Sequence, residues 1–172
     1  MSRIASVVQN TMRFTHDVAV AIQSINDHMC HSMVEGRFVT YILGIIDLKT
    51  NIITLTNAGH MSPVIKKADG SVEEFSDEII GIPIGIMSGY PYEVVQRQIE
   101  PGDVYTLITD GVDEAMDPDG NLYSKERVIN FIEKGSTNPE KLGKDMLADV
   151  RTHANGRPQN DDITIMVFGR TS

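Results

Sequence analysis

Two aspartates stand where an apolar run meets a loop, a position suited to chemistry. Asp110 ends the run TLIT and is followed by Gly111, and Asp161 comes just before the run ITIMVF. Carboxylates at strand ends are held by a rigid scaffold and still reach into a cleft, as a hard divalent cation or an acid–base pair requires. Both residues also fit an ordinary turn, because aspartate is common at strand ends. Their position alone leaves both interpretations open.

Other polar groups could likewise have either a chemical or a structural role. The segment 57–60, Asn-Ala-Gly-His, ends a predicted strand, so its imidazole could ligate a metal or could bond to the local backbone. His28 and His31 have i, i+3 spacing beside Cys30, but no third ligand is close in sequence, which favours surface histidines and a buried thiol. One acidic cluster lacks the register of a calcium loop and is interpreted as a solvated turn: Asp113, Glu114, Asp117 and Asp119.

The elements that must position these groups begin with helices. Apolar residues at helical spacing predict two helical pieces within residues 2–33, and Thr15 is the predicted N-cap of the second. From Arg37 the chain becomes rich in β-branched and aromatic residues. Residues 38–47 and 51–60 are predicted to pair as a hairpin.

Further strands follow in the middle of the chain. Residues 63–68 and 71–76 are predicted to form a second hairpin, with Asp69 and Gly70 in a type I′ turn. Glycine and proline interrupt residues 79–89, which indicates a buried loop with one short strand. Two more strands are expected in segments 92–100 and 103–111.

The C-terminal third returns to helices and ends with a strand. Ser124 and Asn138 are the predicted N-caps of two helices, Asn155 and Gly156 mark a stop, and a last strand is expected at 161–170. Segregated helices and antiparallel strands predict the α+β class, with sheet packed on sheet and helices outside.

Composition limits the kind of protein. The chain has 172 residues, which suits one domain, and 24 acidic against 15 basic residues give a net charge of −9. This charge argues against nucleic acid or an anionic membrane as partner. The single cysteine excludes a disulfide framework, and no apolar run approaches the roughly 20 residues of a membrane span. The N-terminus has no signal-peptide pattern, so the cytoplasm is expected.

Four segments in order resemble one family. They are NAGHMSPVI, IGIPIGI, EPGDVYTLITDGVDEAMDPDGNLYSKERV and QNDDITIMVF, within the region from Phe38 to Phe168. They resemble bacterial PPM-type serine/threonine phosphatases, in the stage II sporulation protein E-like branch that includes regulators of stress sigma factors. The resemblance implies a β-sandwich of mostly antiparallel strands flanked by helices, with a two-metal site for Mn²⁺ or Mg²⁺. It also implies hydrolysis of phosphoserine or phosphothreonine by a metal-activated water.

The resemblance assigns roles to individual residues. Asp110 and Asp161 match metal ligands, Gly111 matches the glycine beside the first ligand, and Asp162 matches an acid with a structural role. A further motif matches residues that shape the fold and receives no catalytic role: Asn57, Gly59 and His60. The implied substrate is a phosphorylated regulatory protein, typically an anti-sigma-factor antagonist.

The N-terminal part of the chain lacks two motifs of the family. Two aspartate motifs that precede the first long helix in the family have no counterpart in residues 1–36, where Asp17 and Asp27 fall within predicted helices. Asp47 lies on a different strand. Residues 1–172 therefore resemble a single phosphatase domain that begins partway through its first helix.

Three hypotheses follow from this departure. The two-metal site should be incomplete, because hard cations bind weakly to few ligands, so little turnover is expected from this chain alone. Uncovered strand edges would favour homodimers. The alternative to an enzyme is a non-catalytic module of the same fold that binds a partner in sigma-factor signalling.

Overall fold

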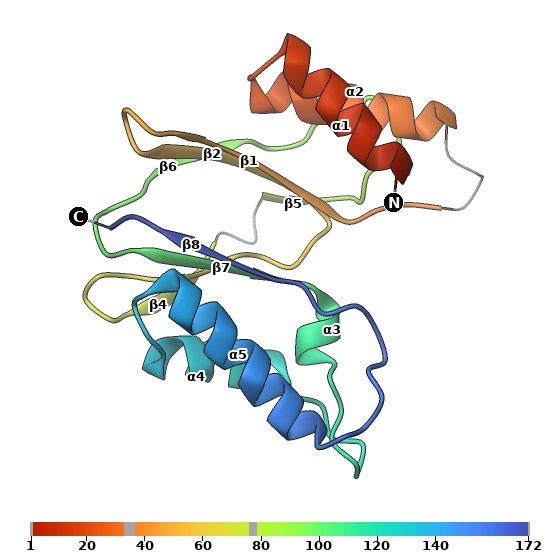
Figure 1. The fold of residues 1–172 in the computed structure, drawn as a ribbon. Helices are drawn as coiled ribbons and strands as arrows, with labels where there is room; N and C mark the ends of the chain where they lie inside the picture. The colour runs from red at the N-terminus through yellow and green to blue at the C-terminus, as the bar shows by residue number, and fades with distance from the viewer. Residues whose placement is uncertain (1, 33–36, 76–78, 172) are drawn as a thin grey trace. The chain divides into compact units, whose positions relative to one another are not determined.

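The computed structural model describes residues 2–32, 37–75 and 79–171 and divides into two compact units (Figure 1). Unit 1 comprises Met1–His60 and Ser76–Gln98, and unit 2 comprises Met61–Phe75 and Ile99–Ser172. Each unit has its own sheet and its own helices. Met33, Gly36 and Ser76, which end or follow predicted elements, lie outside the described residues.

Unit 1 begins with the two predicted helices, α1 (Ser2–Phe14) and α2 (Val18–Ser32). The N-cap of α2 is Asp17 and not Thr15, because the Asp17 carboxylate accepts the backbone N–H of Val20 at 3.0 Å. The hydroxyl of Thr15 accepts the N–H of Asp17 at 3.1 Å and so shapes the turn one step earlier. The prediction that placed Asp17 inside a helix was wrong by one residue, since helix α2 begins directly after it.

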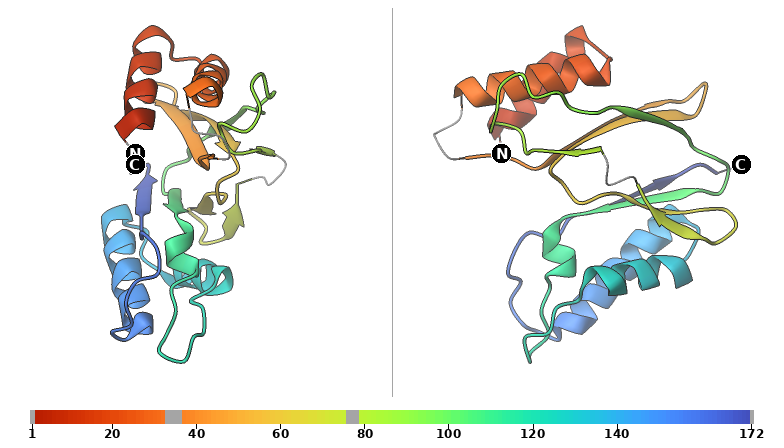
Figure 2. Two further views of the ribbon diagram at one scale, coloured as in Figure 1. Left: turned by 90° about the vertical axis from the view of Figure 1, so that its right-hand side faces the viewer. Right: turned by 180° about the vertical axis from the view of Figure 1, so that it is seen from behind.

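The sheet of unit 1 is built around one central strand. Strand β2 (Ile52–Ala58) pairs antiparallel with β1 (Tyr41–Asp47), as the first predicted hairpin requires. On its other edge β2 pairs antiparallel with β6 (Val95–Gln98) and, further along, parallel with the two-residue strand β5 (Ile80–Gly81). Figure 2 shows α1 and α2 together on one face of this sheet. Their buried contacts include Ile22, Ile25, Leu43, Ala58 and Ile84.

The sheet of unit 2 has four antiparallel strands in the order β4-β3-β7-β8. Their bounds are Val72–Glu74 for β4, Val64–Lys66 for β3, Val104–Ile108 for β7 and Ile165–Gly169 for β8. The β3–β4 hairpin was predicted, but its turn is not type I′, because Gly70 has a positive φ of 88° and Asp69 does not. The carbonyl of Lys67 instead accepts the N–H of Gly70 at 2.9 Å. This bond closes a turn in which the glycine is the last residue.

Three helices complete unit 2: α3 (Asp110–Asp113), α4 (Lys125–Lys134) and α5 (Pro139–Ala154). The predicted caps are confirmed, since Ser124 accepts the N–H of Arg127 and Asn138 accepts the N–H of Lys141. The short helix α3 was not predicted; residues 110 and 111 were expected to continue the strand. The core of this unit includes Val112, Val128, Ile132, Met146 and Val150.

The α+β class is confirmed, with antiparallel pairing in both sheets apart from the short β2–β5 contact. Among the described helices none has the length and apolar character needed to cross a membrane.

Candidate metal site

Asp110 lies where a buried strand changes into a helix. Strand β7 is buried over Val104 to Thr106, and the chain then turns at Thr109, whose φ of −90° and ψ of 160° make it the N-cap position of α3. Asp110 is the first residue of that helix, and its side chain is exposed. Its Oδ1 accepts the N–H of Gly111 at 3.0 Å. The deep strand therefore fixes the backbone while the carboxylate faces solvent.

Thr109 ties this strand end to the segment that precedes β8. Its Oγ1 donates to the carbonyl of Asp162 at 2.8 Å and accepts the N–H of Thr164 at 2.9 Å. Its own N–H donates to the carbonyl of Thr164 at 3.1 Å. These three bonds extend the β7–β8 pairing into the loop and hold residues 161–164 beside Asp110.

Gly111 allows the two segments to approach closely. A Cβ atom at this position would lie 2.5 Å from the carbonyl oxygen of Asp162 and 3.1 Å from that of Asp161, and the first distance is shorter than real Cβ contacts. Gly111 does not have a positive φ. The glycine is required by this close approach, which brings the backbone beside Asp110 against that of Asp161 and Asp162.

Asp161 and Asp162 differ in what they contribute. Both side chains are exposed. The Oδ1 of Asp161 accepts the N–H of Asp162 at 2.6 Å, and the Asp161 carbonyl accepts Nε2 of Gln159 at 2.5 Å. Asp162 contributes its carbonyl to the Thr109 hydroxyl.

Asp113 adds negative charge one helical turn after Asp110. Burial raises the pKa of the Asp113 carboxyl, and the negative charge of Asp110 raises it further, against the opposing influence of Lys125. Its Oδ1 is buried and has no hydrogen-bond partner among the described residues. The negative charges of Asp110 and Asp113 therefore repel each other.

The described residues fit part of a metal site. Asp110 and Asp161 are hard oxygen donors on adjoining segments, which suits Mn²⁺ or Mg²⁺. Within residues 2–32, 37–75 and 79–171, no group of three or more His, Cys, Asp or Glu side chains could hold a metal ion. A complete two-metal centre is therefore not assembled from this part of the chain.

Three other residues considered from sequence have structural partners: Asn57, His31 and Cys30. Asn57 donates to the carbonyl of His60 at 2.9 Å and accepts its N–H at 2.8 Å, so it closes the turn that ends β2. His31 bonds to the Asp27 carbonyl through Nδ1 at 2.6 Å. The thiol of Cys30 contacts Asn26. The two Asn57 bonds give this residue a structural role at the end of β2.

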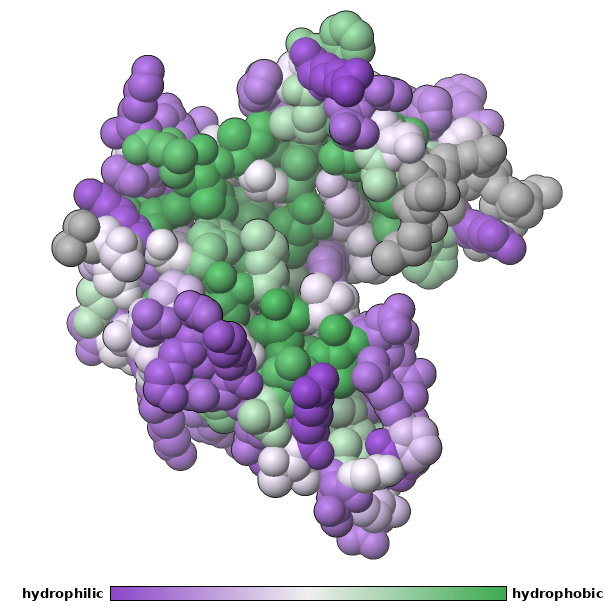
Figure 3. Space-filling view, in the orientation of Figure 1, coloured by the Kyte–Doolittle hydropathy of each residue, from purple (hydrophilic) through white to green (hydrophobic). Residues whose placement is uncertain are grey.

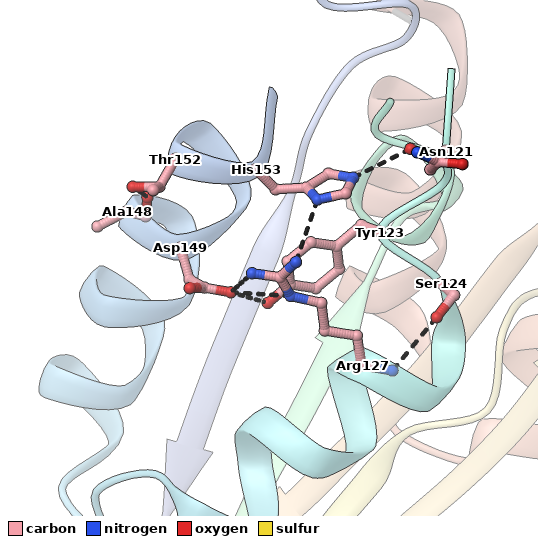
Figure 4. Close-up of polar contacts among 8 residues, drawn as sticks. All are labelled: Asn121, Tyr123, Ser124, Arg127, Ala148, Asp149, Thr152 and His153. Atoms are coloured by element: carbon pink, nitrogen blue, oxygen red, sulfur yellow. Dashed lines mark hydrogen bonds and ion pairs between the residues drawn. The ribbon is translucent and has the colours of Figure 1, made fainter. Parts of the chain in front are cut away.

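A polar cluster that the sequence did not predict supports the loop after α3 (Figure 4). The Asp149 carboxylate accepts the hydroxyl of Tyr123 at 2.7 Å and Nη2 of Arg127 at 2.9 Å. Arg127 also bonds to Nδ1 of His153, and Nε2 of His153 bonds to the carbonyl of Asn121. Burial, followed by the bond to Asp149, raises the pKa of Tyr123. The cluster joins α4, α5 and the intervening loop around residues 121–124.

Comparison with known proteins identifies the class and then the family. The arrangement is that of a PPM-type (PP2C) phosphatase domain, as its structural neighbours are. The chain belongs to the Stage II sporulation protein E (SpoIIE) family, whose sequence model matches residues 1–171. The SiaA-PP2C domain of Pseudomonas aeruginosa has a TM-score of 0.79 at 21% identity, covering 96% of this chain and 67% of that one.

The chain is also similar to further proteins. The manganese-presoaked phosphatase domain of SpoIIE from Bacillus subtilis has a TM-score of 0.66 at 19% identity, covering 99% of this chain and 74% of that one. Full-length SpoIIE of Bacillus subtilis is 26% identical over 88% of this chain, and Protein IcfG of Synechocystis is 23% identical over 87%. The chain spans 18% of the former and 24% of the latter, so it corresponds to a minor part of each.

Proposed function

We propose that this chain is a metal-dependent protein serine/threonine phosphatase domain in which Asp110 and Asp161 ligate Mn²⁺ or Mg²⁺. The observation that carries the proposal is the contact of Gly111 with the Asp161–Asp162 backbone, which sets the two aspartates on adjoining segments. The manganese-presoaked SpoIIE domain among its structural neighbours supports the choice of metal. Residues 1–172 would then act as one domain.

The chain's own residues would perform three tasks. Asp110 and Asp161 would bind the cation through carboxylate oxygens, Thr109 and Gly111 would keep their segments together, and Asp113 would add attractive potential. A bound divalent cation supplies Lewis acidity and neutralises charge on a phosphoryl group. Because two carboxylates give few ligands, we expect weak metal binding and little turnover from this chain alone.

The proposed substrate is a phosphoserine or phosphothreonine on a regulatory protein of the anti-sigma-factor antagonist type, in stress signalling. This follows from the family and not from the geometry of the site. The proposed compartment is the cytoplasm, and a homodimer remains a prediction that rests on the strand edges.

The proposal is tested by the binding of a phosphoserine peptide and its unphosphorylated twin, each followed by fluorescence anisotropy with and without Mn²⁺. We expect Mn²⁺ to strengthen binding of the phosphorylated peptide only, and Asp110→Asn to remove this effect. Asp119→Asn is the matched control, because Asp119 is an exposed acid in the nearby loop. Equal binding of the two peptides in the presence of Mn²⁺ would contradict the proposal.

A second candidate is a non-catalytic module that binds the same kind of partner. The observation in its favour is that the described residues hold no group of three metal-ligating side chains. This candidate predicts that partner binding is unchanged by a chelator and by Asp110→Asn. The peptide experiment therefore separates the two functions.

A further inference from the structure

A cavity of about 270 Å³ adjoins the candidate metal site within unit 2. Gly111 and Asn160 are part of its wall, and they are the chain neighbours of Asp110 and Asp161. Consecutive Cα atoms are about 3.8 Å apart, so the wall begins one residue away from each proposed ligand. The cavity therefore adjoins the two chain segments that carry the proposed ligands.

Apolar side chains line part of the cavity. Ala115 and Met116 line it from the segment after α3, Val150 and Ala154 from α5, and Ile163 from the segment before β8. Val150 is fully buried and belongs to the core of unit 2, which makes that wall rigid. A methionine wall adapts to apolar side chains of different shapes. Figure 3 shows that apolar surface of the chain lies between hydrophilic patches.

Of the two arginines that line this cavity, one has side-chain partners within the protein and the other has none among the described residues. Arg157 is committed to the fold, because it donates to the carbonyl of Asp117 at 2.8 Å and contacts the sulfur of Met116. Arg151 is exposed on α5 and has no side-chain partner among the described residues. The chain has a net charge of −9, so a positive side chain without a partner stands out on it. The guanidinium of Arg151 could pair with an acidic group of a ligand bound at the cavity.

The size of the cavity indicates what it could receive. Pockets for drug-sized ligands measure about 300–1,000 Å³, and this one is smaller. It suits one apolar side chain of an extended peptide. Two extended residues span about 7 Å, so such a side chain would belong to a residue within two positions of the group at Asp110.

We propose that this cavity is a specificity subsite, which receives an apolar side chain within two residues of the phosphorylated serine or threonine, while Arg151 pairs with an acidic residue of the same segment. This inference rests on the proposed function and names the substrate sequence that the site would prefer.

The test uses the full chain with Mn²⁺ and acidic phosphoserine peptides that place Leu at position −2, −1, +1 or +2 from the phosphoserine. Each peptide has a twin with Ala in place of Leu. We expect Leu to lower the Kd about tenfold or more at one of these positions, as burial of a leucine side chain predicts.

Two variants and two controls locate the effect. Ala154→Phe fills the cavity and should abolish the Leu preference, whereas Ala148→Phe, at an exposed position on the same helix, should keep it. Arg151→Glu should weaken binding of the acidic peptides about tenfold, whereas Lys144→Glu, also exposed on α5, should not. If thermal melting shows that Ala154→Phe does not fold, the comparison of Arg151→Glu with Lys144→Glu and the series of Leu and Ala peptides still test the subsite.

The outcomes separate this inference from the proposed function. Phosphate-dependent binding with no Leu preference at any of the four positions would overturn the subsite and leave the phosphatase proposal standing. A Leu preference that persists in Asp110→Asn, without any dependence on phosphate, would show a peptide site unrelated to the phosphorylated residue and would overturn both the subsite and the phosphatase proposal. A Leu preference unchanged in a folded Ala154→Phe would also overturn the subsite.

Discussion

Asn26 in unit 1 and the two aspartates of the candidate site in unit 2 use their polar side chains in opposite ways. In unit 1, Asn26 is completely buried and bonds to the carbonyl of Met87, the N–H of Gly85 and the hydroxyl of Tyr92. In unit 2, Asp110 and Asp161 are exposed, and each carboxylate accepts the N–H of the next residue. A polar group whose partners are all within the protein holds the backbone. A carboxylate with unused acceptor capacity can take a ligand from outside.

The largest expected effect comes from removing the buried Asn26 side chain. Asn26→Ala removes bonds to the Met87 carbonyl, the Gly85 N–H and the Tyr92 hydroxyl from a fully buried position, so we expect the free energy of unfolding to fall by about 3 kcal/mol or more. Urea denaturation measures this change. Asn10→Ala, on an exposed face of α1, should have almost no effect. Similar losses in both variants would show that the Asn26 bonds do not carry this stability.

The next largest effect should come from the contact that joins the two aspartate segments. Gly111→Ala puts a Cβ 2.5 Å from the Asp162 carbonyl, so we expect a loss of about 2 kcal/mol and a marked loss of Mn²⁺ affinity. Gly44→Ala is the control, because its Cβ would meet nothing closer than 3.7 Å. Unchanged Mn²⁺ affinity in Gly111→Ala would show that the close approach is irrelevant to metal binding.

A smaller effect should follow from removing the Thr109 hydroxyl. Thr109→Val deletes the bonds to the Asp162 carbonyl and the Thr164 N–H, at a cost of about 1 kcal/mol. Hydrogen exchange at Thr164 should become faster. Thr109→Ser keeps the hydroxyl and should restore slow exchange; if Ser and Val behave alike, the hydroxyl has no positioning role.

The smallest effect is a pH dependence in unit 1. Bonds from Ser88, Gly89 and Gln23 lower the pKa of the Asp27 carboxyl in the folded state. Its stabilising contribution is therefore present above the unfolded pKa of about 3.9 and is lost as the pH falls through the lower folded value. The stability difference between wild type and Asp27→Asn should shrink below about pH 4 in urea titrations. A difference that is the same at pH 3 and pH 7 would contradict this assignment.

Local signals predicted most of the elements but not the contacts between them. The N-caps Ser124 and Asn138 were identified because each cap bonds only three residues ahead. The bond from Thr109 to Asp162 spans 53 residues, so nothing near Thr109 in sequence indicates it. The same holds for the Gly111 contact, which no turn geometry requires. At Asp17 and Thr15, two good capping residues competed, and spacing alone selected the wrong one.

The metal roles of Asp110 and Asp161 came from the family resemblance and stay predictions. They are tested most directly by calorimetric titration of the chain with Mn²⁺, in wild type, Asp110→Asn, Asp161→Asn and the control Asp119→Asn. The account predicts weak binding in wild type and Asp119→Asn, and a loss of affinity of about tenfold or more in the other two variants. Binding of equal strength in Asp110→Asn, or no binding in wild type, would contradict it.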